Sequence, residues 1–244
     1  MSPHSPLWTT EALARAMGGR LVGNPVPTIR DLSIDSRTLE PGEAYVAIRG
    51  LTHDGHAFAP AALDRGAALA VVSQDWAATA SPGAYLVVPD PLKALEKAGI
   101  AARARTAARI VAVTGSVGKT STKEALALVL SREGRTHAPP KSFNNHIGVP
   151  LTLARMPAAS QFAVFELGMN HAGEITPLSR MVRPDIAVIT AIEPVHIENL
   201  GSIEAIADAK AEIFAGVEPG GAAVLPRDNR FHDRLARAAR AAGI

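Results

Sequence analysis

The sequence predicts an α/β protein built from two α/β units, residues 1–107 and 108–244, with a mostly parallel sheet in the second unit. Three observations support this prediction. Short apolar runs alternate with helical segments, most regularly in the second half, as is typical of parallel strands joined by helical crossovers. A glycine-rich turn at 115–118 joins a strand to a helix. Aromatic residues make up only 4% of the chain, so small aliphatic side chains must form the core.

In the first unit, the pattern predicts a helix over 10–17 that ends at Gly18-Gly19. Short apolar runs between turn residues predict strands at 20–22, 32–34, 45–48, 68–72 and 85–88. A helix is expected at 57–65. Another helix begins at Pro89-Asp90-Pro91 and continues to about residue 107, where we place the domain boundary.

In the second unit, strands are expected at 110–113, 162–165, 186–190 and 222–225. Helices are expected after the glycine-rich turn, over 123–130, and at 151–155, 175–181, 202–214 and 230–242. Because strands and helices alternate, the carboxyl ends of the strands should face one ligand crevice at the edge of a parallel sheet.

The composition excludes several classes of protein. The net charge of +2 is too small to favour a nucleic-acid partner, and a solvated helix face explains Arg230, Arg234 and Arg237. The absence of cysteine excludes a disulfide scaffold and thiolate metal sites, and it fits a cytoplasmic protein. No apolar stretch is long enough to span a bilayer, and the N-terminus lacks the pattern of a signal peptide. We therefore expect a protein that is not embedded in a membrane.

The glycine-rich turn carries the strongest functional signal, in the segment Gly115-Ser116-Val117-Gly118-Lys119-Thr120-Ser121. Such a turn directs backbone N–H groups toward one point, at the positive end of the helix dipole. Lys119 adds a cation and Thr120 a hydroxyl for Mg²⁺, so the segment predicts a site for nucleotide phosphates. The first glycine of the general pattern is replaced by Val113. The alternative is an ordinary turn that opens a helix, which the Lys-Thr pair disfavours.

Glu166 ends a predicted strand, just before Leu167-Gly168. In phosphate-loop enzymes an acidic residue at the end of a neighbouring strand completes the Mg²⁺ site. We therefore favour Glu166 as a Mg²⁺ ligand over the alternative, a surface glutamate in a loop.

Lys210 lies on the same face of its predicted helix as an apolar stripe formed by Ile203, Ile206, Ile213 and Phe214. Burial of a lysine disfavours its cation and lowers its pKa. A neutral amine reacts with CO₂ to give a carbamate, which binds metal as a carboxylate does. The pattern alone favours the simpler alternative, in which the lysine stem is buried and the ammonium reaches water.

Other polar residues give weaker signals. His196 follows the strand 186–190, where it either contacts Mg²⁺ or phosphate or is simply solvated. Asn144 and Asn145 precede the helix 151–155, which they could cap, and their amides could also bind phosphate oxygens.

The first unit holds two short polar segments, Asp35-Ser36-Arg37 and Asp54-Gly55-His56. An arginine beside a hydroxyl suits a diphosphate or a carboxylate. Both segments are also common turn sequences, so neither identifies a ligand by itself.

Taken together, these motifs resemble the Mur ligases over nearly the whole chain. The resemblance is carried by the blocks 114–121, 144–150, 166–175, 196–199 and 209–214, and in the first unit by the segments from Asp35 to His56. The block 166–175 is most similar to the branch of the family that joins D-Ala-D-Ala to UDP-N-acetylmuramoyl-tripeptide.

The resemblance implies an ATP-dependent amide ligase that acts through an acyl phosphate in peptidoglycan precursor synthesis. Its small-molecule partners would be ATP, UDP-N-acetylmuramoyl-tripeptide and D-Ala-D-Ala, bound by a monomer. The first unit would bind the UDP end of the substrate, and the second would be an ATP-binding domain.

The resemblance also implies a role for each motif residue. Residues 115–121 with Asn144 and Asn145 would bind ATP, and Lys119 would stabilise the transferring charge. Two Mg²⁺ ions would be held by Thr120, Glu166, His196 and a carbamylated Lys210, so the family reverses the interpretation of this lysine. Catalytic roles would fall to Lys119, His196 and Lys210. The UDP end would contact Ser36, Arg37, Asp54, Gly55 and His56.

Members of this family are considerably longer than 244 residues and carry a third domain. From this difference we expect a chain that ends inside the ATP-binding domain and has almost no ligase activity by itself. Three alternatives remain open. They are another Mur-type or folate-polyglutamate-type ligase, a nucleotide- or UDP-sugar-binding module without turnover, and a simple phosphotransferase.

Overall fold

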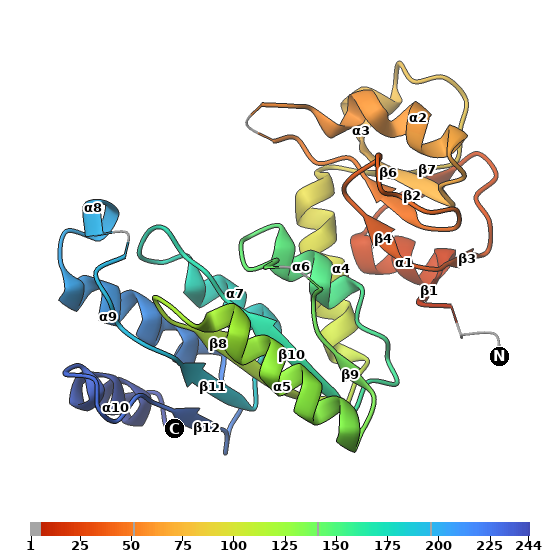
Figure 1. Ribbon diagram of the computed structural model, residues 1–244. Helices are drawn as coiled ribbons and strands as arrows, with labels where there is room; N and C mark the ends of the chain where they lie inside the picture. The colour runs from red at the N-terminus through yellow and green to blue at the C-terminus, as the bar shows by residue number, and fades with distance from the viewer. Residues whose placement is uncertain (1–5, 51, 141, 196) are drawn as a thin grey trace. The chain divides into compact units, whose positions relative to one another are not determined.

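The computed structural model describes residues 6–50, 52–140, 142–195 and 197–244 (Figure 1). The chain divides into two compact units, residues 1–102 and 103–244. The division falls inside helix α4 (Pro91–Ala104), somewhat before the boundary after residue 107 that the sequence indicated. Among the described residues, no helix combines the length and apolar character needed to cross a lipid bilayer.

Unit 1 is built on a five-stranded sheet in the order β2-β7-β6-β5-β4. All neighbouring strands are parallel except β2, which runs antiparallel to β7. The strands of this sheet are β2 (Arg20–Val22), β4 (Leu32–Ser33), β5 (Ala44–Val46), β6 (Leu69–Ser73) and β7 (Tyr85–Val88). The remaining elements are β1 (Trp8–Thr9), α1 (Thr10–Met17), β3 (Thr28–Ile29), η1 (Gly55–Phe58), α2 (Ala59–Asp64) and α3 (Gln74–Ala77).

Helix α1 shows how local sequence sets an element's limits. The Thr9 side chain accepts a hydrogen bond from the backbone N–H of Ala12 and so satisfies one of the helix's free donors. The helix ends at Gly18, whose φ of 68° is the left-handed conformation that glycine adopts without steric cost. Both ends agree with the sequence prediction.

Unit 2 contains a second five-stranded sheet, in the order β12-β11-β8-β10-β9, and all of its strands are parallel. Its strands are β8 (Arg109–Thr114), β9 (Thr136–His137), β10 (Phe162–Glu166), β11 (Ile186–Ile189) and β12 (Ala222–Val224). Its helices are α5 (Lys119–Glu133), α6 (Gly148–Ala154), α7 (Ile175–Val182), α8 (Ile197–Leu200), α9 (Ile203–Ala211), η2 (Glu212–Gly216) and α10 (His232–Ala241).

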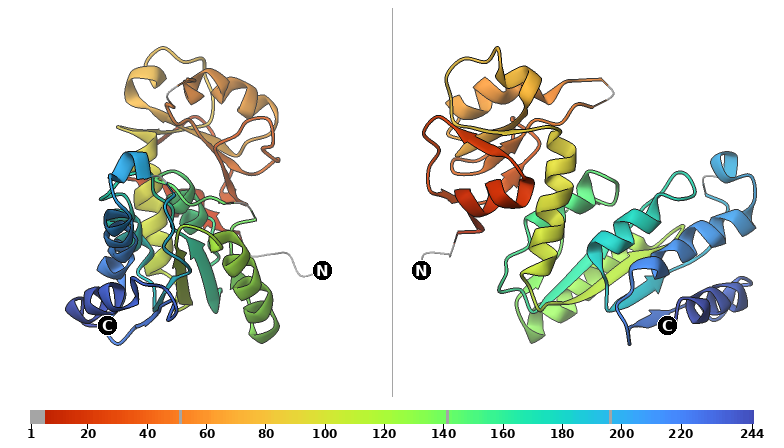
Figure 2. Two further views of the ribbon diagram at one scale, coloured as in Figure 1. Left: turned by 60° about the vertical axis from the view of Figure 1, so that its left-hand side comes forward. Right: turned by 180° about the vertical axis from the view of Figure 1, so that it is seen from behind.

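Helices cover both faces of the unit 2 sheet, because its central strands alternate apolar side chains between the two sides. On one face, residues such as Ile110 and Phe165 join a core that includes side chains of α6, α7, α9 and α10. On the other face, Val111 and Val164 pack against Leu126 of α5 and its neighbours. Figure 1 shows α5 in front of the sheet, and the rear view in Figure 2 shows α7, α9 and α10 on the opposite side.

The predicted α/β class is therefore confirmed. The structure adds five short elements that the sequence pattern did not predict: β1, β3, α3, β9 and α8. It also divides the predicted helix 202–214 into α9 and the 3₁₀ turn η2, and it begins the predicted helix 57–65 with the 3₁₀ turn η1.

Candidate functional site

The glycine-rich loop lies between β8, the central strand of the unit 2 sheet, and α5. Gly118 has a φ of 82° and caps α5, and Gly115 has a φ of 144°, so both use conformations that favour glycine. A Cβ added to Gly115 would lie 2.0 Å from the Thr190 hydroxyl. The loop is anchored by Ser116, whose backbone N–H donates to the carbonyl of Ala191 at 2.8 Å. These contacts hold the loop against the residues that follow β11.

Lys119 begins α5, and its ammonium donates hydrogen bonds to two carbonyls of the loop itself, those of Gly115 at 2.7 Å and Ser116 at 3.2 Å. Burial lowers the pKa of Lys119, and the charge of Glu166 opposes that shift. Val117 and Ser121 have exposed side chains. The loop thus presents one cation and its backbone at the carboxyl end of the central strand.

Glu166, at the end of β10, is only 1% exposed, and its carboxylate is the centre of a polar cluster. One oxygen accepts from the hydroxyl of Thr120 at 3.0 Å. The other accepts from Ser142 Oγ and Asn144 Nδ2, each at 2.8 Å. A buried carboxylate is stable only when such donors or a cation satisfy it. The structure therefore brings together Thr120 and Glu166, the two oxygen donors expected to share a Mg²⁺ ion.

The two asparagines of the segment 144–150 have different surroundings. Asn144 contacts Glu166 and Ser142 rather than a helix end. Asn145 Oδ1 accepts from the backbone N–H groups of Ile147 and Gly148, at 3.1 and 2.8 Å, and so caps the start of α6. The Ser142 contact was not predicted, because a serine in a loop carries no sequence signal for it.

Lys210 lies in the last turn of α9 and is 2% exposed. Within the described part of the chain, its amine makes no hydrogen bond or ion pair. Burial, together with the positive charge of Lys119, lowers the pKa of Lys210 to about 8. The helix that follows β11 thus brings this lysine within electrostatic range of the phosphate loop.

The prediction for His196 lies outside the described residues. Among the residues that the structure describes, no three His, Cys, Asp or Glu side chains gather as a metal site. At the loop, Glu166 supplies a carboxylate and Thr120 a hydroxyl. Hard oxygen donors of this kind suit Mg²⁺, which usually takes only one or two carboxylates from the protein.

In unit 1, the two predicted polar segments both lie near Tyr45, a buried residue of β5. Its hydroxyl donates to the carbonyl of Gly55 at 2.9 Å. Burial and the charges of Asp35 and Asp54 raise the pKa of Tyr45 to about 12, so both carboxylates lie within electrostatic range of one hydroxyl. The structure thus brings the two segments together.

Arg37 is more accessible than the second segment, in which Gly55 and His56 are buried. The guanidinium of Arg37 is bidentate to Asp35, with contacts of 2.9 and 2.8 Å, and its side chain is 86% exposed. Ser36 is half-buried beside it. Arg37 is therefore accessible to a ligand while its guanidinium is paired with Asp35.

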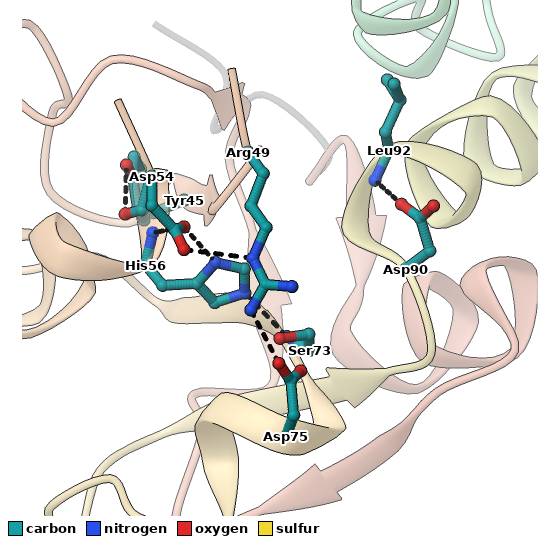
Figure 3. Close-up of polar contacts among 9 residues, drawn as sticks. Tyr45, Arg49, Asp54, His56, Ser73, Asp75, Asp90 and Leu92 are labelled. Carbon is teal, nitrogen blue, oxygen red and sulfur yellow. Dashed lines mark hydrogen bonds and ion pairs between the residues drawn. The ribbon is translucent and has the colours of Figure 1, made fainter. Parts of the chain in front are cut away.

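His56 is 1% exposed, and both of its ring nitrogens are used within the protein (Figure 3). Nε2 accepts a hydrogen bond from the backbone N–H of Ser73 at 2.9 Å, and Nδ1 lies against Asp54 Oδ1. The other carboxylate oxygen of Asp54 accepts from Arg49 Nε at 3.0 Å, and Arg49 Nη2 donates to Asp75 at 2.7 Å. The sequence analysis did not predict a role for Arg49, although this residue follows β5 at a short distance, as Arg37 follows β4.

This network borders a cavity of about 220 Å³ in unit 1. The cavity is lined by Arg49, His56, Ser73, Pro89, Asp90, Pro91 and Leu92. Figure 3 shows Arg49 on one side of it and Asp90, at the start of α4, on the other. The lining residues follow β5, β6 and β7 or end one of them, so the cavity lies at the carboxyl edge of the unit 1 sheet, where α/β proteins commonly bind ligands.

Comparisons with known proteins agree with this geometry. Residues 113–244 match the Mur ligase middle domain, and residues 28–94 match the catalytic domain of the Mur ligase family. A UDP-N-acetylmuramoyl-tripeptide–D-alanyl-D-alanine ligase from Synechocystis sp. is 40% identical over 82% of this chain and 44% of its own length.

Solved structures show the same relationship. A crystal structure of MurF from Acinetobacter baumannii is 34% identical, with a TM-score of 0.86 over 96% of this chain and 51% of its own. MurF ligase from Thermotoga maritima, solved in complex with ADP, is 27% identical, with a TM-score of 0.73 over 85% of this chain and 48% of its own. The chain spans about half the length of the relatives that it matches. Because the middle-domain match alone covers more than half of its residues, this chain belongs to the Mur ligase family.

Proposed function

We propose that unit 2 binds the phosphates of ATP at the loop 115–121, as the ATP-binding domain of a UDP-N-acetylmuramoyl-tripeptide–D-alanyl-D-alanine ligase. The observation that carries this proposal is the convergence of Lys119, Thr120 and Glu166 at the carboxyl edge of one parallel sheet. The relative from Thermotoga maritima, whose structure contains ADP, supports it. Unit 1 would bind the UDP end of the substrate through Ser36 and Arg37. In the segment 54–56, the buried His56 would act through Asp54 rather than by direct contact.

In the proposed reaction the tripeptide carboxylate attacks the γ-phosphorus of ATP, which gives an acyl phosphate and ADP. The amine of D-Ala-D-Ala then attacks the acyl carbon, loses a proton and expels phosphate. Both ATP and the carboxylate are anions, so the protein must offset their repulsion. Lys119 would exchange its loop carbonyls for phosphate oxygens and stabilise the charge that develops on the transferred group.

Thr120 and Glu166 would hold one Mg²⁺ ion, and Lys210, as a carbamate, would help to hold a second with His196. Bound Mg²⁺ would neutralise phosphate charge and orient the γ-phosphate. The residues fit this role because Glu166 supplies a buried carboxylate beside a hydroxyl. Lys210 fits because its low pKa leaves much of the amine neutral and able to react with CO₂ near pH 8.

Phosphate release tests the proposal. It would be measured with ATP and UDP-N-acetylmuramoyl-tripeptide, with and without D-Ala-D-Ala, on this chain and on a version extended to the length of its relatives. We expect release by the extended chain to depend on D-Ala-D-Ala, and calorimetry to show that the 244-residue chain binds Mg–ADP. Lys119→Met should weaken that binding at least tenfold. Phosphate transfer that is indifferent to the dipeptide would contradict the ligase, and binding without turnover by either chain would support a binding module instead.

A further inference from the structure

The hydrogen bonds of His56 determine which of its ring nitrogens carries a proton. A backbone N–H has only a donor role, so the bond from Ser73 to Nε2 requires a free lone pair there. The proton of the neutral ring must then be on Nδ1, which donates to Asp54 Oδ1. With 1% exposure and both nitrogens engaged, His56 has no group left for a ligand. Its effect on a ligand must pass through Asp54.

Asp54 transmits the position of His56 to Arg49. Burial alone would raise the pKa of Asp54, but hydrogen bonds from His56 and Arg49 together lower it, so the carboxylate stays charged. Asp75, from the first turn of α3, holds a second nitrogen of the same guanidinium. Arg49 is thus fixed by two carboxylates from different elements, which restricts a side chain that would otherwise lose much rotamer entropy on binding.

The remaining guanidinium nitrogen, Nη1, makes no hydrogen bond with a described residue. Figure 3 shows it directed away from the two carboxylates, toward the side of the cavity where Asp90 lies. There, Asp90 Oδ1 caps α4 by accepting from the N–H groups of Leu92 and Lys93, at 2.8 and 3.2 Å. Its second oxygen has no hydrogen bond from the described residues. The cavity therefore offers a donor on one wall and an acceptor on the other.

The charge balance determines which chemistry fits. Within the lining, the charge of Arg49 is balanced by that of Asp90, and behind the lining Asp54 and Asp75 add two negative charges beside the same guanidinium. These four residues together are therefore net negative. A phosphate dianion would be repelled, whereas a hydroxyl or a secondary amide offers both an acceptor for Arg49 and a donor for Asp90. A volume of about 220 Å³ is below the range of sites that enclose a whole drug-sized ligand, so the cavity suits one part of a larger molecule.

We propose that Arg49 and Asp90 bind an uncharged part of the substrate that carries hydroxyl or amide groups, namely the sugar attached to UDP rather than the diphosphate. His56 and Asp54 are positioning residues that hold Arg49 for this contact. The inference rests on the proposed function only for the statement that unit 1 binds a UDP-linked sugar.

The test compares the affinities of the 244-residue chain for UDP and for UDP-N-acetylglucosamine, whose sugar is uncharged, by calorimetry. We expect the sugar to increase the affinity of the wild-type chain at least tenfold. Arg49→Met should reduce this increase to less than threefold and leave the affinity for UDP unchanged. His56→Gln should reduce it partly, because glutamine accepts from Ser73 but does not also donate to Asp54 in the same geometry. If His56 had only a structural role, His56→Gln would instead lower the affinities for UDP and for UDP-N-acetylglucosamine by the same factor.

Two further variants test the second wall of the cavity and provide a control. Asp90→Asn retains a cap for α4, since asparagine caps helices as well as aspartate does, yet it removes the acceptor charge and should lower the sugar's contribution. Arg30→Met, which breaks an exposed pair with Glu40 in the same unit, is the matched control and should change neither affinity. An equal loss of affinity for UDP and for UDP-N-acetylglucosamine in the Arg49→Met variant would overturn the proposal in favour of a contact with UDP itself. If the wild-type chain bound UDP and UDP-N-acetylglucosamine with equal affinity, the sugar proposal would be overturned but the proposed function would stand. If it bound neither nucleotide, the function proposed for unit 1 would be overturned as well.

Discussion

At the scale of single residues, the buried carboxylate of Glu166 is held by side chains from two other segments, Thr120 from one and Ser142 with Asn144 from the other. Lys119, Thr120 and Glu166 could be assigned to one edge because a strand, a turn and a helix fix where their backbones lie. Asn144 and Arg49 show the limit. The amide of Asn144 contacts Glu166, which is 22 positions away, and Arg49 reaches Asp75 across 26 positions. Such contacts follow from the path of loops, for which a single sequence carries no periodic signal.

Lys210 gives a prediction at the same scale. With its pKa lowered to about 8, the folded chain loses this proton at a lower pH than the unfolded chain, for which the ordinary value is 10.5. The unfolded state therefore binds more protons between these values, and stability rises with pH across this window. Below pH 8, both states are protonated and the full cost of burying the ammonium remains, on the order of 3 kcal/mol.

Urea unfolding at pH 7, 8, 9 and 10 measures this effect as the difference between Lys210→Met and the wild-type chain. The variant should be more stable at pH 7, and the difference should shrink steadily up to pH 10. Lys93→Met serves as the control, because Lys93 is exposed and its pKa is raised by Glu96. A pH-independent difference for the Lys210 variant would contradict an ammonium buried at this position.

At the scale of elements, α7 depends on a residue from a distant part of the chain. Glu212, at the start of η2, accepts hydrogen bonds from the backbone N–H groups of Ile175 and Thr176, at 3.1 and 3.0 Å, and from that of Gly173. These are donors at the N-terminus of α7, where a negative charge also meets the positive end of the helix dipole. The residue that precedes α7, Glu174, makes no such cap with its own side chain.

Glu212→Ala should therefore lower the free energy of unfolding by about 1–2 kcal/mol, the usual effect of losing a helix cap. Amide hydrogen exchange should accelerate most at residues 173, 175 and 176, because these groups lose their acceptor. Glu204→Ala, on the exposed side of the neighbouring helix α9, should change exchange at none of them. Faster exchange spread evenly over unit 2 would argue against a local cap.

The same contact explains why the sequence predicted long elements but not their junctions. The helix expected over 202–214 is periodic, and η2 interrupts it where Glu212 and Gly216 meet α7. A Cβ on Gly216 would lie 2.1 Å from the carbonyl of Ser179, so the two backbones pack directly. Two-residue strands such as β1, β3 and β9 are too short to show an alternating pattern, and tertiary contacts alone place them.

At the scale of the whole molecule, each unit contains a hydrophobic core of its own. One core gathers Tyr45, Val72 and Tyr85 of unit 1, and another gathers Ile110, Phe165 and Leu235 of unit 2. Both tryptophans, Trp8 and Trp76, belong to unit 1. Tryptophan fluorescence therefore follows the unfolding of unit 1, whereas the helical circular dichroism signal follows both units.

Ligand-induced stabilisation should accordingly be confined to one unit at a time. Mg–ADP at about 100 times its Kd should stabilise unit 2 by about 2.7 kcal/mol and raise the urea midpoint of amide exchange in β8. It should leave the tryptophan midpoint unchanged, because the phosphate loop and both tryptophans lie in different units. UDP-N-acetylglucosamine should raise the tryptophan midpoint and leave the exchange midpoint of β8 unchanged, since its proposed site lies in unit 1. If either ligand moved both midpoints by the same free energy, the two units would unfold as a single cooperative body.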